Sequence, residues 1–220
     1  MSLAEPDTAA PRHKRRRRSV GLPGALLLVI SGPSGVGKDA VIEALRRRPE
    51  PRSTHHVVTY TTRARRPGET DGVSYHFVDD ATFAAMRAEG DLLEANEVHG
   101  HWYGTPRDQV VDALTSGRDV ILKIDVQGAR VVRRHARGAV LIFIVPPSPE
   151  DLEARLRGRA TETADELALR QRDALLELAR QGDYDYIVVN ETGQVDRTAA
   201  RIEEIIAAEH RAEPDRRVSV

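Results

Sequence analysis

Short apolar runs alternate with amphipathic stretches along most of the chain. Runs suited to buried strands cover residues 25–30, 119–125, 139–145 and 186–189, with a weaker run at 56–60. Between them, the helical spacing of apolar positions predicts helices over residues 38–48, 106–116, 127–136, 149–158, 164–181 and 195–210. Strands that alternate with helices favour an α/β fold, in which helices cover both faces of a parallel sheet.

Two segments do not fit this alternation. Residues 60–103 contain turn signals and short alternating runs at 74–78 and 91–98, so we expect a small antiparallel sheet inserted into the main domain. Residues 151–172 are strongly charged and include arginine at five positions. A mobile helical cover over bound anions has this composition, and so does a solvated helical face.

Composition sets broad limits on where the protein works. The chain of 220 residues is long enough for one sizeable core, and it has no cysteine. No apolar run approaches the ~20 residues of a membrane-spanning helix, and the first residues lack the apolar stretch of a secretory signal. We therefore expect a cytoplasmic protein with no membrane partner.

The charge is distributed unevenly along the chain. Residues 1–20 hold six basic and two acidic residues, whereas the whole chain has a formal net charge of −1. Because this basic segment lacks apolar periodicity, we expect a disordered, solvated tail rather than a contact with nucleic acid or an anionic surface. Residues 211–220 are expected to form a second loose tail.

The segment after the first apolar run has the spacing of a phosphate-binding loop. Gly32-x-x-x-x-Gly37-Lys38 allows the backbone to turn tightly and to aim its N–H groups at phosphate oxygens, with a helix beginning near the lysine. Lys38 can then reach the terminal phosphates, and it is one of only three lysines, with Lys14 and Lys123, among 33 basic residues. The expected triphosphate-binding residues are Gly32, Pro33, Ser34, Gly35, Val36, Gly37, Lys38 and Asp39.

Asp39 stands where such a loop usually offers a serine or threonine hydroxyl to Mg²⁺. A carboxylate about 4 Å from a phosphate oxygen is repelled by ~4 kcal/mol at an effective dielectric of 20, but a divalent cation between the two reverses the sign. Asp39 is therefore either a substitute metal contact or a first-turn helix aspartate that points into solvent. Both interpretations stay open at this stage.

Three further stretches resemble the guanylate kinase family. They are VTYTTRARRPGETDGVSYHFV (58–78), LLEANEVHGHWYGT (92–105) and LKIDVQGA (122–129), and with the phosphate loop they extend the resemblance over residues 25–210. The resemblance implies a P-loop NTPase type of fold and an enzyme that transfers the γ-phosphate of ATP to GMP. We expect dGMP as a further acceptor, and Mg²⁺ as the cofactor that accompanies ATP.

The resemblance also implies a division of the domain, residues 21–210, into three parts. A core that binds ATP would comprise residues 21–57, 104–150 and 173–210. The inserted antiparallel lobe, residues 58–103, would bind GMP, and a helical lid, residues 151–172, would close over ATP.

In the lobe, the resemblance assigns four residues to the phosphate of GMP. Arg63 and Arg66 would bind it, because forked guanidinium donors suit phosphate oxygens. The hydroxyls of Tyr75 and Tyr103 would add neutral donors.

The resemblance assigns four other residues to the guanine end. Guanine presents adjacent N–H donors and a carbonyl acceptor, so Glu94 would accept from the donors and Thr105 would donate to the carbonyl. Asp125 would accept from a remaining guanine N–H, and Thr59 lies where the family has another small hydroxyl contact.

Asp125 and Lys123 each have two possible roles. Asp125 ends an apolar strand, as a metal-positioning aspartate of a phosphate-loop enzyme does. Lys123 lies two residues earlier, on the same strand face, at a position where related enzymes often have an acid. Lys123 would therefore either stabilise the phosphoryl group in transfer or form an ion pair with Asp125, and we favour the ion pair.

The charged cover segment resembles the lid of the family. Arg155, Arg159 and Arg170 match its phosphate-contacting arginines, and together with Lys38 they form the expected catalytic set. The stretch VVNET (188–192) resembles the turn after the last strand, which would place Asn190 against the edge of adenine.

The expected chemistry requires no general base, because the second pKa of a phosphate monoester is ~6 and the acceptor is already ionised at neutral pH. In-line alignment and charge stabilisation would then carry the reaction. Two alternatives are a sugar-phosphate kinase of the same fold, which needs no guanine contacts, and a catalytically silent guanylate-kinase-like binding module, whose only support is Asp39.

Overall fold

A five-stranded parallel sheet forms the centre of the computed structural model, which describes residues 21–49, 53–157 and 164–220. In spatial order its strands are β2 (Thr54–His56), β7 (Asp119–Lys123), β1 (Leu27–Ser31), β8 (Val140–Val145) and β9 (Tyr186–Val189). Every neighbouring pair is parallel, which confirms the predicted sheet. The predicted disordered tail, residues 1–20, lies outside the described residues.

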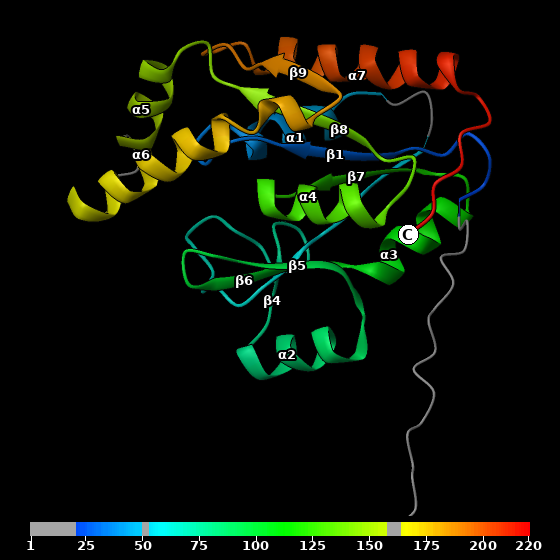
Figure 1. The fold of residues 1–220 in the computed structure, drawn as a ribbon, viewed down its shortest axis with the longest axis horizontal. Helices are drawn as coiled ribbons and strands as arrows, with labels where there is room; N and C mark the ends of the chain where they lie inside the picture. The colour runs from blue at the N-terminus through cyan, green and yellow to red at the C-terminus, as the bar shows by residue number, and fades with distance from the viewer. Residues whose placement is uncertain (1–20, 50–52, 158–163) are drawn as a thin grey trace, which may run out of the picture.

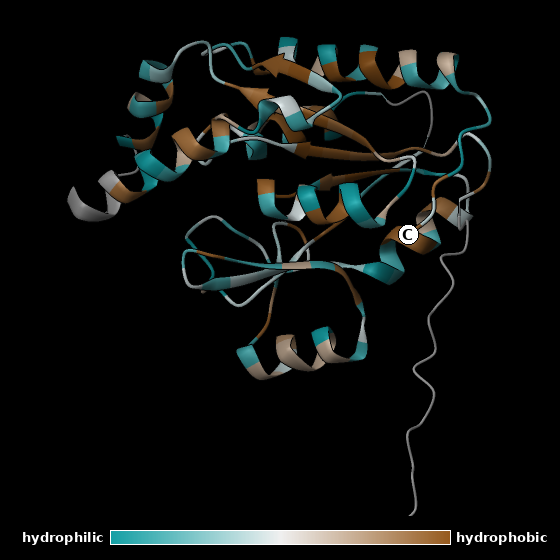
Figure 2. Cartoon of the chain, in the orientation of Figure 1, coloured by the Kyte–Doolittle hydropathy of each residue, from teal (hydrophilic) through white to brown (hydrophobic). Residues whose placement is uncertain are grey.

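Helices cover both faces of this sheet, as predicted (Figure 1). The helices α1 (Lys38–Arg46) and α7 (Val195–Ala212) pack on one face, and α3 (Arg107–Thr115) and α4 (Val126–His135) pack on the other. Successive residues of a strand face opposite sides, so Leu28 contributes to the first cluster and Leu27 to the second. Figure 2 shows the result, with hydrophobic strands enclosed between helices whose outer surfaces are hydrophilic.

A second, smaller sheet forms the inserted lobe. Its strands, in spatial order, are β4 (His76–Phe77), β3 (Tyr60–Thr61), β6 (His101–Pro106) and β5 (Leu92–Val98). The pairs β3–β6 and β5–β6 are antiparallel, which confirms the predicted small antiparallel sheet, and the short edge pair of β3 and β4 is parallel. The weak apolar run at 56–60 lies where the chain crosses from β2 of the large sheet to β3 of the small one.

The lobe also contains a helix that the sequence pattern did not predict. It is α2 (Asp80–Glu89), which lies at the far end of the lobe in Figure 1. The carboxylate of Asp79 caps it by accepting a hydrogen bond from the Thr82 N–H at 2.7 Å. Phe83 is its buried residue and stacks on Trp102, with ring centroids 5.9 Å apart.

Two helices form the described part of the predicted lid, α5 (Pro149–Arg157) and α6 (Ala164–Leu178). A short 3₁₀ helix, η1 (Gln181–Asp183), connects α6 to β9. Within the ranges that the structure describes, no helix is both long enough and apolar enough to cross a membrane.

The prediction of a loose tail over residues 211–220 is wrong. Val218 is completely buried in the core cluster beneath α3, and the backbone of Ser219 pairs with that of Arg137. An ion pair between Arg216 and Glu209 fixes the chain after α7. The sequence pattern did not reveal this, because two valines at the end of a mostly polar stretch are too few to show a periodicity.

Because Val218 is fully buried, we expect Val218→Ala to lower the free energy of unfolding by about 1–3 kcal/mol. Urea denaturation with unchanged m-value would measure the loss. Val73→Ala is a matched control, since Val73 is 53% exposed. Equal stability of the Val218 variant and the native chain would show that the last residues do not pack on the core.

Candidate functional site

The site lies at the carboxyl edge of the large sheet, where β1 is flanked by strands from two different parts of the chain. Ligands of open α/β sheets bind at such a point, because loops diverge there. A cavity of about 540 Å³ opens between this edge, the lobe and α6. The predicted site residues that line it are Ser34, Gly35, Gly37, Lys38, Asp39, Thr59, Arg63, Arg66, Tyr75, Glu94, Tyr103, Asp125 and Arg170.

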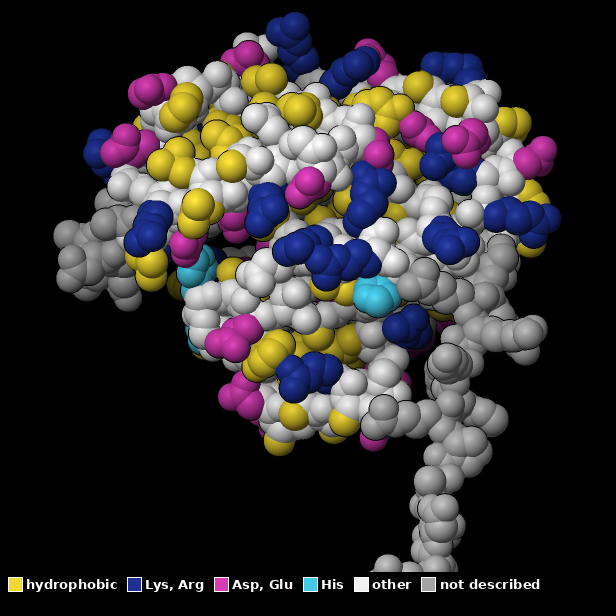
Figure 3. All heavy atoms as spheres, in the orientation of Figure 1, with side chains coloured by type: hydrophobic (Ala, Val, Ile, Leu, Met, Phe, Trp, Pro, Cys, Tyr) yellow, Lys and Arg dark blue, Asp and Glu magenta, His cyan; other side chains and the backbone are white. Residues whose placement is uncertain are grey.

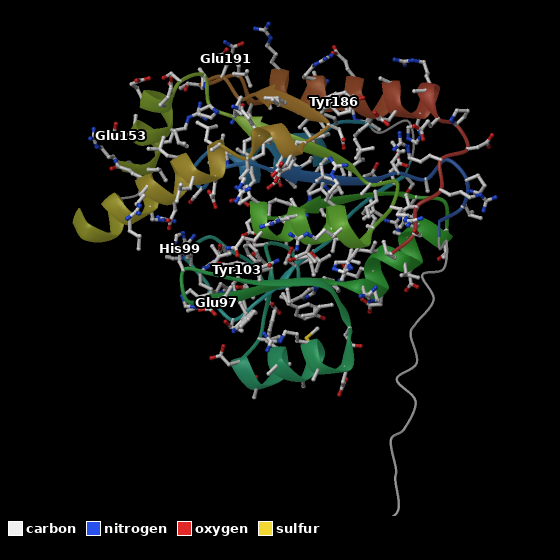
Figure 4. The ribbon with its side chains drawn as sticks, in the orientation of Figure 1. Glu97, His99, Tyr103, Glu153, Tyr186 and Glu191 are labelled. Atoms are coloured by element: carbon white, nitrogen blue, oxygen red, sulfur yellow. The ribbon has the colours of Figure 1, made fainter. Side chains whose placement is uncertain are left out.

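The figures show how the cavity opens. In Figure 3 the surface is hollowed between α6 and the end of the lobe formed by β5 and β6. Figure 4 shows His99 at the tip of these two strands, on the side of α6. The His99 ring lies 3.8 Å from the carboxylate of Asp173, measured from Nδ1 to Oδ2, so the lobe approaches α6 at the mouth of the cavity.

The phosphate-binding loop connects β1 to α1 in a conformation that requires glycine. Gly32 has φ 146°, and a Cβ atom there would lie 2.4 Å from the carbonyl oxygen of Ile144. Gly37 has φ 100°, and a Cβ atom there would lie 2.7 Å from Nδ2 of Asn190. The backbone of the loop is therefore set by close contact with the ends of β8 and β9.

Lys38, the first residue of α1, folds back over this loop. Its ammonium donates to the carbonyl oxygens of Gly32 at 2.6 Å and Pro33 at 3.1 Å. Burial lowers the pKa of Lys38, while the carboxylates of Glu177, Asp39 and Asp125 oppose that shift. The ammonium is thus held at the loop by acceptors that a phosphate would replace.

Glu177 is a site residue that the sequence reasoning missed. It lies on α6, 143 positions from the loop, and its Oε2 accepts a hydrogen bond from the Ser34 N–H at 2.8 Å. Burial raises the pKa of Glu177, against the lowering effect of this hydrogen bond and of Lys38. Nothing in its local sequence marks it, since it is one charged residue on an amphipathic helix.

Arg63 and its neighbours form the anion-binding part of the lobe. Arg63 is 8% exposed and donates to Glu69 Oε1 at 2.6 Å and to the Tyr103 hydroxyl at 3.3 Å. Glu69 also accepts from the backbone N–H of Arg66 at 2.7 Å. Burial disfavours the charge of Arg63, but Glu69 and Tyr103 outweigh it and raise the pKa of Arg63. A fixed guanidinium therefore faces the cavity.

Glu94 is the buried acid of the lobe, at 4% exposure. Its Oε1 accepts from the Thr105 hydroxyl at 2.6 Å, and its Oε2 accepts from the Asn96 amide at 2.5 Å. Burial raises the pKa of Glu94 to about 7, although both hydrogen bonds act in the opposite direction. This carboxyl group can therefore change its charge near neutral pH.

Asp125 and Glu94 lie on either side of Gly128, where a larger residue would not fit. Its Oδ1 caps α4 by accepting from the Gly128 N–H at 2.8 Å, and a Cβ atom at Gly128 would lie 2.8 Å from Glu94 Oε2. Among the described residues, Asp125 Oδ2 is buried and has no hydrogen-bond partner. Burial raises the pKa of Asp125, against the hydrogen bond from Gly128 and the charge of Lys38. Asp125 itself is among the residues that line the cavity.

Two residues predicted to contact the nucleotides have protein partners in the structure. Thr105 is fully buried and donates its hydroxyl proton to Glu94, so it supports the acid instead of presenting a donor to the cavity. Asn190 donates to the Val36 carbonyl at 2.8 Å and accepts from Thr198 at 2.9 Å. Its amide therefore holds the phosphate-binding loop, and the predicted adenine contact stays a prediction.

The three arginines predicted for the lid differ in where they lie. Arg155 donates to the carbonyls of Val36 at 3.0 Å and Asn190 at 2.8 Å, and to the Thr192 hydroxyl, so it holds the loop from outside the cavity. Arg170 lines the cavity. Arg159 lies outside the described residues.

The predicted ion pair between Lys123 and Asp125 is wrong. Lys123 Nζ instead lies 2.5 Å from Oδ1 of Asp39, whose side chain is 73% exposed, so Asp39 pairs with a lysine and also faces solvent, and its metal contact stays a prediction. The sequence gives no sign of this contact, because 84 positions separate the two residues.

Comparison with known proteins places these features in one family. The model of the guanylate kinase family matches residues 25–209. The guanylate kinase of Thermobifida fusca is 50% identical over 74% of this chain and 83% of its own length, and that of Alkalilimnicola ehrlichii is 46% identical over 87% and 93%.

Two further relatives extend the comparison. Guanylate kinase 2 of rice, chloroplastic/mitochondrial, is 44% identical over 85% of this chain, which spans 65% of that protein's length. The crystal structure of guanylate kinase from Anaplasma phagocytophilum superposes with a TM-score of 0.68 at 35% identity, over 91% of this chain and 92% of the other. The chain therefore belongs to the guanylate kinase family.

Proposed function

We propose that the protein transfers the γ-phosphate of ATP to GMP, giving ADP and GDP. One observation carries the proposal: a single cavity brings together the lysine of a phosphate-binding loop, a fixed guanidinium and a buried carboxyl group. These are Lys38, Arg63 and Glu94, which come from α1, the loop after β3, and β5. The first suits a triphosphate, and the other two suit the phosphate and the base of a guanine nucleotide.

Separate residues bind the guanine base and the phosphate of GMP. Glu94 accepts from the guanine N–H donors when it is ionised, and the vacant Oδ2 of Asp125 accepts from another. Arg63 and Arg66 hold the acceptor phosphate. Neither assignment involves the 2′ position of the ribose, so we propose dGMP as an acceptor as well.

Phosphoryl transfer then depends on alignment and charge. The acceptor oxygen is already ionised at neutral pH, so no side chain has to remove a proton. Lys38 moves from the carbonyls of Gly32 and Pro33 to the donor phosphates, and Arg170 approaches them from α6. Negative charge that shifts toward the leaving ADP is then stabilised by these two cations.

The residues present fit a Mg²⁺ ion that arrives with ATP. Carboxylate oxygen is the ligand type that Mg²⁺ prefers, and Asp39, the acid of the phosphate-binding loop, lines the cavity with a side chain that is 73% exposed. The described residues hold no cluster of three or more metal-binding side chains, so phosphate oxygens and water would supply the remaining ligands. When bound, the ion neutralises charge on the donor phosphates.

A coupled assay for ADP tests the proposal directly. With ATP present, we expect turnover with GMP and dGMP, and at least about 10³-fold lower kcat/KM with AMP, which lacks the N–H donors that Glu94 reads. Turnover with a sugar phosphate in place of GMP would support the alternative of a sugar-phosphate kinase of the same fold. Tight binding of both nucleotides without ADP release would support the silent binding module.

A further inference from the structure

Lys123 lies at a junction of three elements. It ends β7, and its ammonium contacts Asp39 in the first turn of α1 and the hydroxyl of Tyr75 just before β4, at 2.5 Å and 3.3 Å. The ammonium also lies 4.6 Å from the centroid of the Tyr75 ring. The large sheet, the phosphate-binding loop and the lobe therefore meet at one lysine.

The two partners leave part of the ammonium available. A lysine ammonium has three N–H donors, and within the described residues Lys123 uses two of them, on Asp39 and Tyr75. Burial disfavours its charge, but Tyr75 and Asp39 outweigh this effect and raise the pKa of Lys123. The side chain is 18% exposed and lines the cavity, so the third donor is accessible from the substrate side.

The surroundings of Lys123 indicate which substrate it faces. The Tyr75 ring that it contacts also lies beneath the guanidinium of Arg63, whose Cζ is 5.5 Å from the ring centroid. Tyr75 in turn packs edge-on against Tyr103, with centroids 5.9 Å apart. Lys123 and Arg63 thus contact the same tyrosine ring, and of these two cations Lys123 is the one that lies next to the phosphate-binding loop.

Asp39 places a negative charge at a position of the phosphate-binding loop that usually has a neutral hydroxyl. A carboxylate in the first turn of α1, at the position of the usual hydroxyl, would by itself repel the phosphates of both nucleotides. The ammonium of Lys123 neutralises it, in a pair whose carboxylate is 73% exposed and whose lysine is mostly buried. Asp39 therefore fixes the direction of the ammonium at the cavity wall.

We propose that Lys123 is a further phosphate-binding residue of this kinase, which donates to a phosphate oxygen of GMP while Asp39 and Tyr75 position it. This inference rests on the proposed transfer to GMP and adds a cation to the acceptor site. It also explains why a chain with only three lysines among 33 basic residues has one here, since a compact ammonium fits between a carboxylate, a phenol and a phosphate.

Calorimetry with GMP and with guanosine, in the absence of ATP, tests the proposal. Guanosine has the same base and ribose but no phosphate. We expect Lys123→Met to weaken GMP binding about 10- to 100-fold and to leave guanosine binding unchanged. If the methionine variant does not fold, Lys123→Gln replaces it. The glutamine keeps hydrogen-bonding groups without the charge, and we expect the same loss for GMP and none for guanosine. Lys123→Arg should recover part of the loss.

Two further variants separate positioning from direct contact. Asp39→Asn should weaken GMP binding less than Lys123→Met, and adding it to Lys123→Met should cause no further loss, because the residue that it positions is already gone. Arg201→Met is the matched control: it removes one cation from an exposed pair with Glu204 on α7 and should leave GMP binding unchanged.

Equal losses for GMP and guanosine in Lys123→Met would overturn the inference, because they would mean that the lysine only holds the lobe in place. Unchanged binding of GMP would overturn it as well. The proposed function fails separately, since it requires that the native chain release ADP, whereas the binding comparison does not depend on turnover.

Discussion

Replacing Lys38 by methionine is expected to lower kcat for GMP phosphorylation by about 100- to 1,000-fold. Methionine has a similar length but no charge, and the position then lacks the only cation that the described part of the phosphate-binding loop offers to the donor phosphates. Affinity for GMP should change little, because the acceptor site is built from the lobe and β7. Steady-state kinetics with separate KM values for ATP and GMP would measure the effect.

Lys38→Arg is the informative companion variant. Arginine is abundant in this chain and keeps the charge, but its planar guanidinium does not match an ammonium that sits 2.6 Å and 3.1 Å from two loop carbonyls. We therefore expect most of the activity to be lost in this variant too. A Lys38→Met enzyme with native kcat would show that the loop lysine does not stabilise the reaction.

The strands of the large sheet could be predicted because burial on both faces makes them continuous apolar runs. Leu27 to Ile30 and Val140 to Val145 are buried at every position, so no polar residue interrupts the pattern. The elements of the lobe lack this signal. β3 and β4 are two residues long, and α2 buries one side chain, Phe83, so neither period 2 nor period 3.6 is visible.

The site was predictable where the motif itself fixes the geometry and unpredictable where folding brings distant residues together. The loop from Gly32 to Lys38 is local, and its glycines have the positive φ angles that the spacing predicted. The Lys123–Asp39 pair and the contact between Glu177 and Ser34 join residues 84 and 143 positions apart. No periodicity connects such residues, so only the folded chain reveals them.

Buried polar groups explain why two residues predicted to contact ligands, Asn190 and Arg155, hold the phosphate-binding loop in this structure. The tight phosphate-binding loop leaves the Val36 carbonyl pointing toward β9, and a buried carbonyl needs a donor. Asn190 and Arg155 both donate to it, at 2.8 Å and 3.0 Å. The residue types were those that bind nucleotides, but in this conformation their hydrogen bonds go to the loop.

Guanine binding is expected to weaken as pH falls through neutrality. The pKa of Glu94 is raised to about 7, so the acid is mostly ionised above this pH and mostly protonated below it. Only the carboxylate can accept from both guanine N–H donors, and binding therefore competes with protonation. From about pH 8 to about pH 6 the Kd for guanosine should rise about 10-fold, since the ionised fraction falls by that factor.

Guanosine is the right ligand for this measurement, because the phosphate of GMP titrates near pH 6 and would add its own dependence. In Glu94→Gln the amide offers one acceptor and does not titrate in this range, so guanosine should bind about 10- to 100-fold more weakly at about pH 8. The loss with falling pH should disappear in the same variant. If the Kd of the native protein for guanosine does not change with pH, Glu94 is not the group that binds guanine. Protonation of Glu94 would remove the acceptor on which that binding depends.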